Sequence, residues 1–241
     1  MRILAGLFSL LLSSAVVADG KAFTVGVETL DYLPHYSVQG GEYKGFAADV
    51  LRAFAKEKGY SIQFKPYPVA RLISVFVAGE VDFKYPDNAN WAGDVKKGVT
   101  IVYSEPVSQI TDGAMVTPAM KGKVQLKTLG APRGFTPWSY LGDINAGKIK
   151  VQELDSVDAL IKSVQSNRVD AGYANVDVAQ YYMKNTLKTP DALVFDESLP
   201  FDRFTVHLST IKHAAVVAEF NQFLKDKKGM IDGLRAQYGL K

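Results

Sequence analysis

Apolar residues change their spacing repeatedly along residues 23–83, and the change predicts strands separated by helices. Residues 23–28 carry β-branched and aromatic side chains at alternate positions, as is typical of a strand. From Ala47 onward, apolar side chains recur at i, i+3, i+4 and i+7, which predicts a helix over 46–60. The same reasoning predicts a strand at 61–66, a helix at 69–79 and a strand that begins at 81. Short connections in this order favour a parallel sheet covered by helices.

The second half of the chain repeats this plan. Its predicted elements are a strand and turn at 124–134, a short helix at 136–141 with Pro137 in its first position, a strand at 149–154, a helix at 156–167, a strand at 169–175 and a helix at 176–187. A Val-Asp pair opens a strand in each half, at Asp82 and at Asp170. The halves share almost no other residues, so two similar α/β lobes are favoured over a tandem duplication.

The order of the predicted elements places the last forty residues back in the first lobe. A strand is expected at 204–210, followed by helices at 213–229 and 230–240. The chain would then cross between the lobes twice, near 108–113 and near 200–203. We therefore expect a first lobe at 19–110, a second lobe at 111–201 and a return segment at 202–241, with a solute bound between the lobes.

The first eighteen residues predict export. Arg2 precedes an apolar run, and small residues end at Ala18, which is the layout of a cleaved signal peptide. The apolar run is shorter than the ~20 residues that a membrane span needs. The chain contains no cysteine, so it has neither disulfides nor a lipidated anchor, and we expect the periplasm of a Gram-negative cell. The net charge of +3 is spread without a basic block, which argues against nucleic acid.

Several motifs resemble those of one protein family. They are Tyr32-Leu33-Pro34, the helix opening at 41–59, the helix and Val-Asp strand at 68–83, the Tyr-Ser-Glu-Pro-Val stretch at 103–107, and the second-lobe stretches 133–137 and 167–177. Together they cover about residues 22–240 and resemble the type II periplasmic binding proteins, in particular solute-binding protein family 3. The resemblance implies two α/β lobes, each a mostly parallel sheet flanked by helices, joined by two hinge crossings.

The resemblance also implies a function and partners. Members of this family are monomers that capture a small polar solute and present it to the membrane permease of an ABC importer. Members that bind amino acids use an Arg for the α-carboxylate and an Asp for the α-amino group. At those positions this chain has Lys97 and Asn175, and a lysine is a poorer partner than arginine for a planar carboxylate. Lys97 is either a ligand contact or a solvated surface residue.

Further ligand contacts are expected at the edges of the predicted strands. The extended loop 85–93 offers Asp87 as a substitute anionic group, and Thr136 precedes a predicted helix whose amides could hold an anionic oxygen. The remaining candidates, each weighed against packing or a surface salt bridge, are Tyr32, Arg71, Asn88, Trp91, Arg133 and Phe135. With Asp87 as the lone nearby acid, these residues favour an anionic or neutral solute that has a flat or apolar portion.

Two other functions remain open from the sequence. One is a soluble sensor subunit that delivers its solute to a membrane receptor. The other is a dehydratase-like enzyme on the same scaffold, with Glu28 or Asp87 as general acid or base. No paired acid and base and no nucleotide or nucleophile motif is evident, so we expect a binding protein without a cofactor. The three histidines are scattered, which argues against a zinc site.

Overall fold

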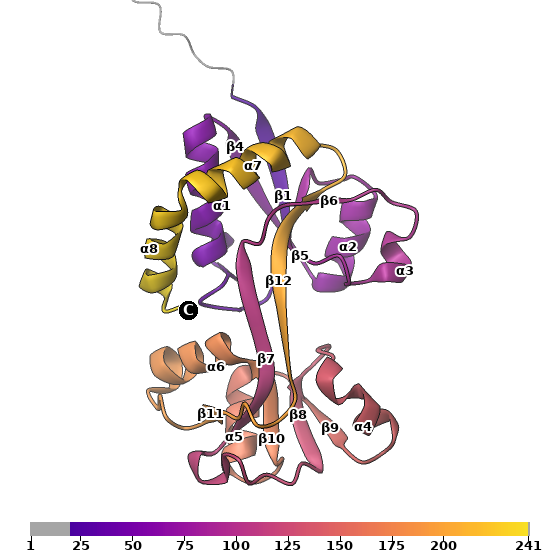
Figure 1. The fold of residues 1–241 in the computed structure, drawn as a ribbon, viewed down its shortest axis with the longest axis vertical. Coiled ribbons are helices and arrows are strands. Elements are labelled where there is room, and N and C mark those ends of the chain that lie inside the picture. Colours follow the sequence, from indigo (N-terminus) through magenta and orange to yellow (C-terminus); the bar gives the residue numbers. More distant parts are fainter. Residues whose placement is uncertain (1–19, 241) are drawn as a thin grey trace, which may run out of the picture.

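The protein folds into two α/β lobes joined by two long antiparallel strands, β7 (Ser108–Val116) and β12 (Phe201–Thr210). The computed structural model describes residues 20–240, so the expected signal peptide at 1–18 lies outside the described residues. Figure 1 shows β7 and β12 side by side between an upper and a lower group of elements, here called the first and second lobes. These two strands are the crossings between the lobes. The lobe boundaries 19–110, 111–201 and 202–241 remain predictions.

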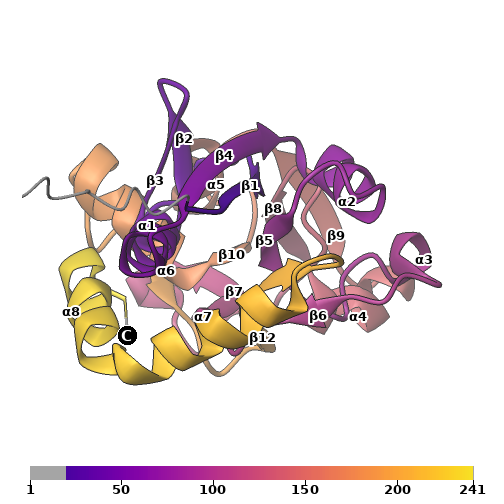
Figure 2. The same ribbon diagram turned by 90° about the horizontal axis from the view of Figure 1, so that it is seen from above.

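The first lobe is built around three parallel strands in the order β4-β1-β5. Its strands are β1 (Ala22–Glu28), β2 (Ser37–Gln39), β3 (Glu42–Lys44), β4 (Ser61–Tyr67), β5 (Phe83–Asp87) and β6 (Val102–Tyr103), and its helices are α1 (Phe46–Lys58), α2 (Val69–Val77), α3 (Gly93–Lys96), α7 (Ala214–Asp226) and α8 (Lys228–Tyr238). Helices α1, α7 and α8 lie to one side of these strands and α2 and α3 to the other (Figure 2).

The second lobe repeats the arrangement with parallel strands in the order β10-β8-β9. Its strands are β8 (Thr128–Pro132), β9 (Lys150–Leu154), β10 (Ala171–Asn175) and β11 (Val194–Phe195), and its helices are α4 (Leu141–Asn145), α5 (Val157–Gln165) and α6 (Val176–Tyr182). Short 3-10 turns lie at Pro118–Met120 and Trp138–Tyr140, and a π turn at Met183–Leu187 continues α6. The ladder of hydrogen bonds continues from one lobe to the other through β12 and β7.

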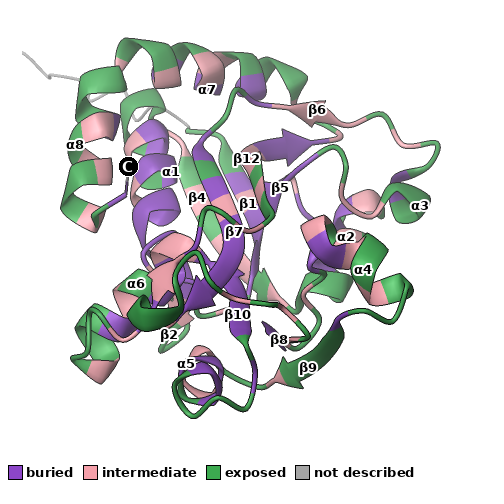
Figure 3. Ribbon diagram, turned by 60° about the horizontal axis from the view of Figure 1, so that its bottom comes forward, coloured by how far each residue is buried: buried purple, intermediate pink, exposed green. Residues whose placement is uncertain are grey.

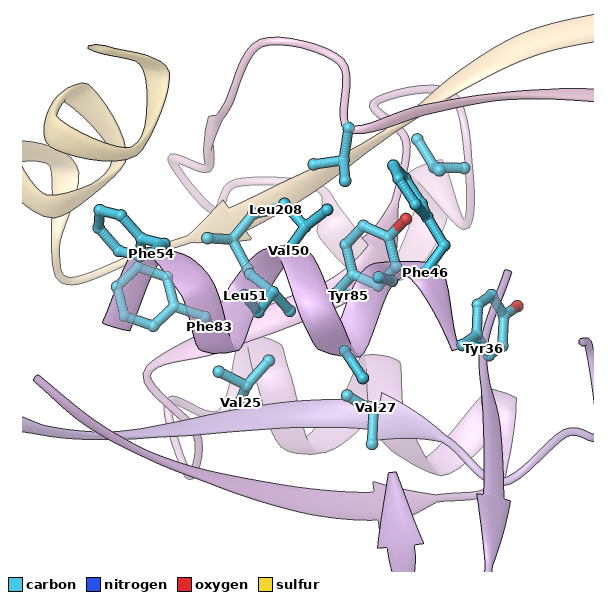
Figure 4. Packing of buried hydrophobic residues seen from close by; sticks show 14 of the residues in the cluster. Val25, Val27, Tyr36, Phe46, Val50, Leu51, Phe54, Phe83, Tyr85 and Leu208 are labelled. Carbon is cyan, nitrogen blue, oxygen red and sulfur yellow. The ribbon is translucent and has the colours of Figure 1, made fainter. Parts of the chain in front are cut away.

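The apolar face of α1 that the sequence pattern predicts forms the centre of the first lobe. Phe46, Val50, Leu51 and Phe54 are buried on this face. Figure 4 shows them packed over the strands, with Val25 of β1 among their neighbours. Each large apolar side chain buried in this way contributes about 1.5–3 kcal/mol relative to an exposed position. The helix ends at Gly59, whose left-handed backbone conformation suits glycine.

The two Val-Asp pairs perform the same task in both lobes. Asp82 accepts hydrogen bonds of 2.8 Å from the backbone amide and from the hydroxyl group of Thr24, the third residue of β1. Asp170 accepts bonds of 2.7 and 2.8 Å from the amide and hydroxyl of Thr128, the first residue of β8. In each case the aspartate ties the start of its strand to the neighbouring parallel strand. The repeated dipeptide is therefore a structural brace.

Replacement of Asp82 by asparagine is expected to lower the free energy of unfolding by about 1–2 kcal/mol, because two donors lose a charged acceptor. Burial opposes ionisation of Asp82, but the bonds from Thr24 outweigh it and lower its pKa to about 2. The stabilisation is therefore present above pH ~4 and is lost as the pH falls toward 2. Urea unfolding of wild type and Asp82→Asn between pH 2 and 7 measures this. A difference in the free energy of unfolding between the two proteins that stays constant from pH 2 to 7 would contradict the role of Asp82 as a charged acceptor. Asp94→Asn, on the exposed face of α3, is the matched control.

Local differences from the sequence prediction occur where side-chain packing overrides the pattern. Pro137 precedes the turn Trp138–Tyr140 as its N-cap and does not occupy the first helical position. The β2–β3 hairpin was not predicted, and its turn uses Gly40 and Gly41, both at positive φ. Strands β1, β5, β7 and β10 are largely buried, whereas β9 lies at the exposed edge of the second lobe (Figure 3).

Candidate functional site

Two aspartates face each other on the two strands that join the lobes. In the antiparallel register of β7 and β12, Asp112 pairs with Asp202, so both side chains lie on the same face of the ribbon. Asp112 is buried, with 6% of its surface exposed. Two like charges directly opposite each other on neighbouring strands are destabilising unless a proton or a cation relieves the repulsion. This pair is the most unusual electrostatic feature between the lobes.

Residues from both lobes surround the carboxyl group of Asp112. The side-chain amide of Asn175 donates to it over 3.2 Å, and Tyr32 of the first lobe lies near enough to interact with it electrostatically. Burial raises the pKa of Asp112 to about 7, and the charges of Asp202 and Asp177 act in the same direction. Near neutral pH the group is therefore divided between its neutral and charged forms.

An aromatic contact joins the lobes next to this carboxyl group. Tyr32, which follows β1, lies with its ring 6.2 Å from the ring of Phe135, which follows β8. On its other side Tyr32 stacks on Tyr36 at 5.2 Å, and the hydroxyl group of Tyr36 donates to Glu28 over 2.7 Å. Both strands end at this point, which is where ligands bind in open α/β sheets. The structure thus brings together two of the predicted contacts, Tyr32 and Phe135.

A histidine adds a polar contact between the lobes. His35 is buried in the first lobe, and its Nε2 atom lies 3.4 Å from Oδ2 of Asp177 in the first turn of α6. Its Nδ1 atom lies 3.4 Å from the hydroxyl group of Ser108, at the start of β7. Val178 of α6 belongs to the same apolar cluster as Tyr32. The lobes are therefore in contact along this side of the interlobe strands.

Asn175 has a structural task in addition to its contact with Asp112. Its Oδ1 atom accepts a 2.9 Å bond from the backbone amide of Val178, so Asn175 caps α6. The amide oxygen is thereby occupied, and the amide nitrogen faces Asp112. At this end of β10, the acidic side chains between the lobes are Asp112 and Asp177.

Asp87 lies at the centre of a closed cluster of charges in the first lobe. Its Oδ1 atom accepts bonds from Lys96 at 2.7 Å and from Lys84 at 3.0 Å, and its Oδ2 atom accepts a 2.6 Å bond from Ser209. Asp87 has no exposed surface. Burial opposes its ionisation, but the two lysines outweigh burial and lower its pKa. The charge of Asp87 is thus neutralised within the first lobe, and other acids lie between the lobes, while contact of Asp87 with a ligand remains a prediction.

The extended loop after β5 supports this cluster. Asn88 donates to the backbone oxygen of Thr205 on β12 over 2.8 Å, and its own oxygen accepts from the amide of Asn90. Trp91 lies edge to face with Phe204, with ring centroids 5.6 Å apart, and the ammonium group of Lys84 lies 5.8 Å from its ring. Asn88 and Trp91 therefore hold the loop against an interlobe strand, close to the first-lobe side of the candidate site.

Four predicted contacts lie on exposed surface. The guanidinium group of Arg71 stacks on the ring of Tyr67 at 5.9 Å. Lys97 is exposed at the end of α3, whereas its neighbour Lys96 is the residue that turns inward. Arg133 pairs with Glu153 and Asp155 of the second lobe, both at 2.8 Å. The side chain of Thr136 is also exposed. No observation brings these residues to Asp112, and their contact with a ligand remains a prediction.

The segment around Thr136 differs from the anion site that the sequence suggested. The turn that follows is three residues long, and a short α4 comes directly after it. The backbone amide of Gly134 already faces Glu153, with 3.5 Å between nitrogen and carboxylate oxygen. A carboxylate of the protein thus competes for the donors that were expected to hold an anionic ligand.

Sequence reasoning missed the acids of the site because they are single residues in unremarkable positions. Asp112 occupies one inward position of a strand, and Asp177 is the second residue of a helix, where an acid is ordinary. The sequence signal that could have found Asp112 was an aspartate in a predicted lobe crossing, where the strands of both lobes end.

Within residues 20–240, no group of three or more metal-binding side chains is arranged to hold an ion. None of the helices in that range is long and apolar enough to cross a membrane.

Two lobes that end their parallel strands against each other, joined by two strands, define a class of two-lobed binding proteins. Residues 23–89 match the model of the bacterial extracellular solute-binding proteins, family 3. The match is confined to part of the first lobe, and the two-lobed α/β arrangement confirms the predicted fold class.

Two curated relatives carry the resemblance beyond the first lobe. The "Probable histidine-binding protein" of Neisseria gonorrhoeae is 24% identical over 186 residues, which cover 69% of this chain and 63% of that protein. The "Arginine-binding extracellular protein ArtP" of Bacillus subtilis is 23% identical over 176 residues, which cover 69% of this chain and 66% of the relative. The matched region spans slightly less than two thirds of either relative. Both are named as binding proteins.

A solved structure supports the fold over nearly the whole chain. The ligand-binding core of GluR0, in complex with L-glutamate, superposes with a TM-score of 0.71 and covers 91% of this chain and 99% of its own. Its sequence is 15% identical, so this likeness concerns the fold alone.

Proposed function

We propose that this protein is a periplasmic receptor that captures a small cationic solute, such as a basic amino acid, between its lobes. The observation that carries the proposal is the buried Asp112, with two partly buried acids near it, on the side of the interlobe strands where Tyr32 meets Phe135. Asp112, Asp177 and Asp202 lie on elements that meet there. A buried carboxylate requires a partner of opposite charge, and a cationic solute supplies one.

The relatives support a cationic solute. One is named for histidine and the other for arginine, both of which carry a basic side chain. The sequence-based expectation of an anionic or neutral solute followed from Lys97 and Asn175, with Asp87 as the lone nearby acid; Asp112 adds a buried acid between the lobes. Aromatic walls suit the apolar part or the flat guanidinium or imidazole group of such a solute, because cations bind favourably to aromatic faces.

Binding would couple the two lobes through the interlobe strands. The solute enters when the ribbon of β7 and β12 bends, and the lobes then close so that Tyr32 and Phe135 cover it. The protein acts as a monomer that delivers the solute to the membrane permease of an ABC importer. We propose binding without turnover: both curated relatives are named as binding proteins, and Glu28, the acid considered for catalysis, accepts the hydroxyl group of Tyr36.

A thermal-shift screen tests this function. The mature protein is unfolded in guanidinium chloride, refolded to remove any bound solute, and melted with L-arginine, L-lysine, L-histidine, L-glutamate or succinate. A solute at 100 times its dissociation constant should stabilise the fold by about 2.7 kcal/mol. We expect at least one basic amino acid to raise the melting temperature and the two acids to leave it unchanged. A shift with L-glutamate or succinate alone would contradict the proposal.

A further inference from the structure

We propose that Asp112 is the residue that selects a cationic solute, and that it releases a proton to solvent when the solute binds. The inference rests on the proposed function and specifies how the site achieves it. In this scheme the O–H bond of the neutral carboxyl group breaks, the proton leaves with water, and the carboxylate pairs with the cationic group of the solute. No other reactant is required.

The position of Asp112 supports this role. It lies on β7, one of the two strands that join the lobes (Figure 1), and its side chain shares a face of the ribbon with that of Asp202. Its neighbours come from both lobes: Asn175 from the end of β10 and Tyr32 from the segment after β1. An acid at this point can fix the solute before the lobes close.

The other acids of the site are already engaged. Asp202 accepts the hydroxyl group of Tyr173 at 2.7 Å and the amide of Ser139 at 3.1 Å. Glu28 accepts the hydroxyl group of Tyr36. Asp177 faces His35 and is partly exposed. The hydrogen bond to Asp112 comes from the neutral amide of Asn175, and the nearby Tyr32 is a neutral phenol, so these neighbours leave its charge without a counterion.

The surroundings of Asp112 explain why a proton occupies the site in the absence of a cation. Burial is the main cause of its raised pKa of about 7. The titratable and charged groups that face it are Asp202 on β12, Asp177 on α6, Tyr32 after β1 and Tyr173 on β10, together with His35, which contacts Asp177. The acids among them favour the protonated form of Asp112, whereas a bound cation favours the ionised form. Solute binding and proton loss are therefore linked.

Titration calorimetry with L-arginine tests the linkage. The refolded protein is titrated between pH 5.5 and 8.5 in phosphate and in Tris, whose different ionisation enthalpies reveal the number of protons released. For the unchanged protein, we expect affinity to fall about tenfold for each pH unit below ~6.5 and to level off above ~7.5, with up to one proton released per L-arginine in the acidic range. For Asp112→Asn, we expect affinity at pH 8 to fall at least tenfold and the proton release to disappear.

The asparagine variant should fold, and its stability provides a second measurement. A raised pKa in the folded state means that stability due to Asp112 decreases as the pH rises from ~4 through 7. Asp112→Asn removes this penalty, so its melting temperature without solute should match that of the unchanged protein at pH 4 and exceed it by an increasing margin from pH 5 to pH 8. Asp191→Asn, an exposed second-lobe carboxylate, is the matched control and should change neither affinity nor melting temperature.

The outcomes separate this inference from the function on which it rests. If L-arginine binds Asp112→Asn within twofold of the unchanged protein at pH 8, with the same dependence on pH, Asp112 does not select the cation, although the receptor function stands. If L-arginine, L-lysine and L-histidine all fail to bind the unchanged protein at any of these pH values, the proposed function fails, and this inference fails with it.

Discussion

Asp87→Asn is expected to lower the free energy of unfolding at pH 7 by about 3–5 kcal/mol, the cost of leaving buried charges without their partner. Lys84 and Lys96 both donate to Asp87, and the two side chains are 2% and 7% exposed. Asparagine keeps the shape of the side chain and its bond from Ser209, but it removes the only charge that both lysines share in this cluster. The protein must then bury two ammonium groups or deprotonate one of them.

The pH dependence of this loss identifies its cause. Burial already lowers the pKa of Lys84 in the intact cluster, and removal of Asp87 lowers it further. In the variant the unfolded state binds more protons than the folded state, so stability should rise between pH 7 and 10. Urea unfolding at these pH values measures the change in stability. Adding Lys96→Met to Asp87→Asn removes one of the two unpaired ammonium groups and should restore part of the lost stability. A loss below about 1 kcal/mol at pH 7 would mean that water reaches the lysines.

Phe135→Ala is expected to weaken the binding of a basic amino acid roughly 30- to 150-fold, equivalent to about 2–3 kcal/mol. Phe135 follows β8 and meets Tyr32 across the lobes, so it is placed to cover a bound solute. Its side chain is half-buried in a loop, and its removal should change the melting temperature of the solute-free protein little. Calorimetry with L-arginine measures the change in affinity.

Trp138 provides the control for this prediction. It is a larger aromatic residue three positions further along the same segment, but 59% of its surface is exposed. Trp138→Ala should leave the affinity for L-arginine within a factor of two of the unchanged protein. Equal losses in both variants would indicate a general distortion of the segment and would remove Phe135 from the site.

The fold could be predicted from the sequence because its signals are local and repeated. The spacing of apolar residues in α1 and the alternation in β1 each indicate an element within a dozen residues. The Val-Asp pairs at Asp82 and Asp170 mark equivalent points of the two lobes, and the identical braces to Thr24 and Thr128 explain why the dipeptide recurs. Where the pattern is weak, as at Pro137, the boundary shifts by a residue or more.

The charges of the site could be predicted less well because they depend on contacts between distant residues. Counting from the family motifs places the expected arginine at Lys97. In the structure Lys97 is exposed, and its neighbour Lys96 points toward Asp87. Asp112 and Asp202 are ninety positions apart, and the register of two strands alone makes them neighbours. Asn175 carries no charge, and the acid next to its amide nitrogen, Asp112, lies on another strand.

The most direct test of the account is the distance between the lobes with and without a basic amino acid. The chain contains no cysteine, so single cysteines at Asp94 on α3 and Asn145 on α4, both exposed, allow clean double labelling with spin probes. Pulsed electron resonance on the refolded protein should show that L-arginine, L-lysine or L-histidine at saturation shifts the distribution toward the shorter distances of the closed arrangement. L-Glutamate should not produce this shift. An unchanged distribution with an amino acid that calorimetry shows to be bound would contradict capture between the lobes.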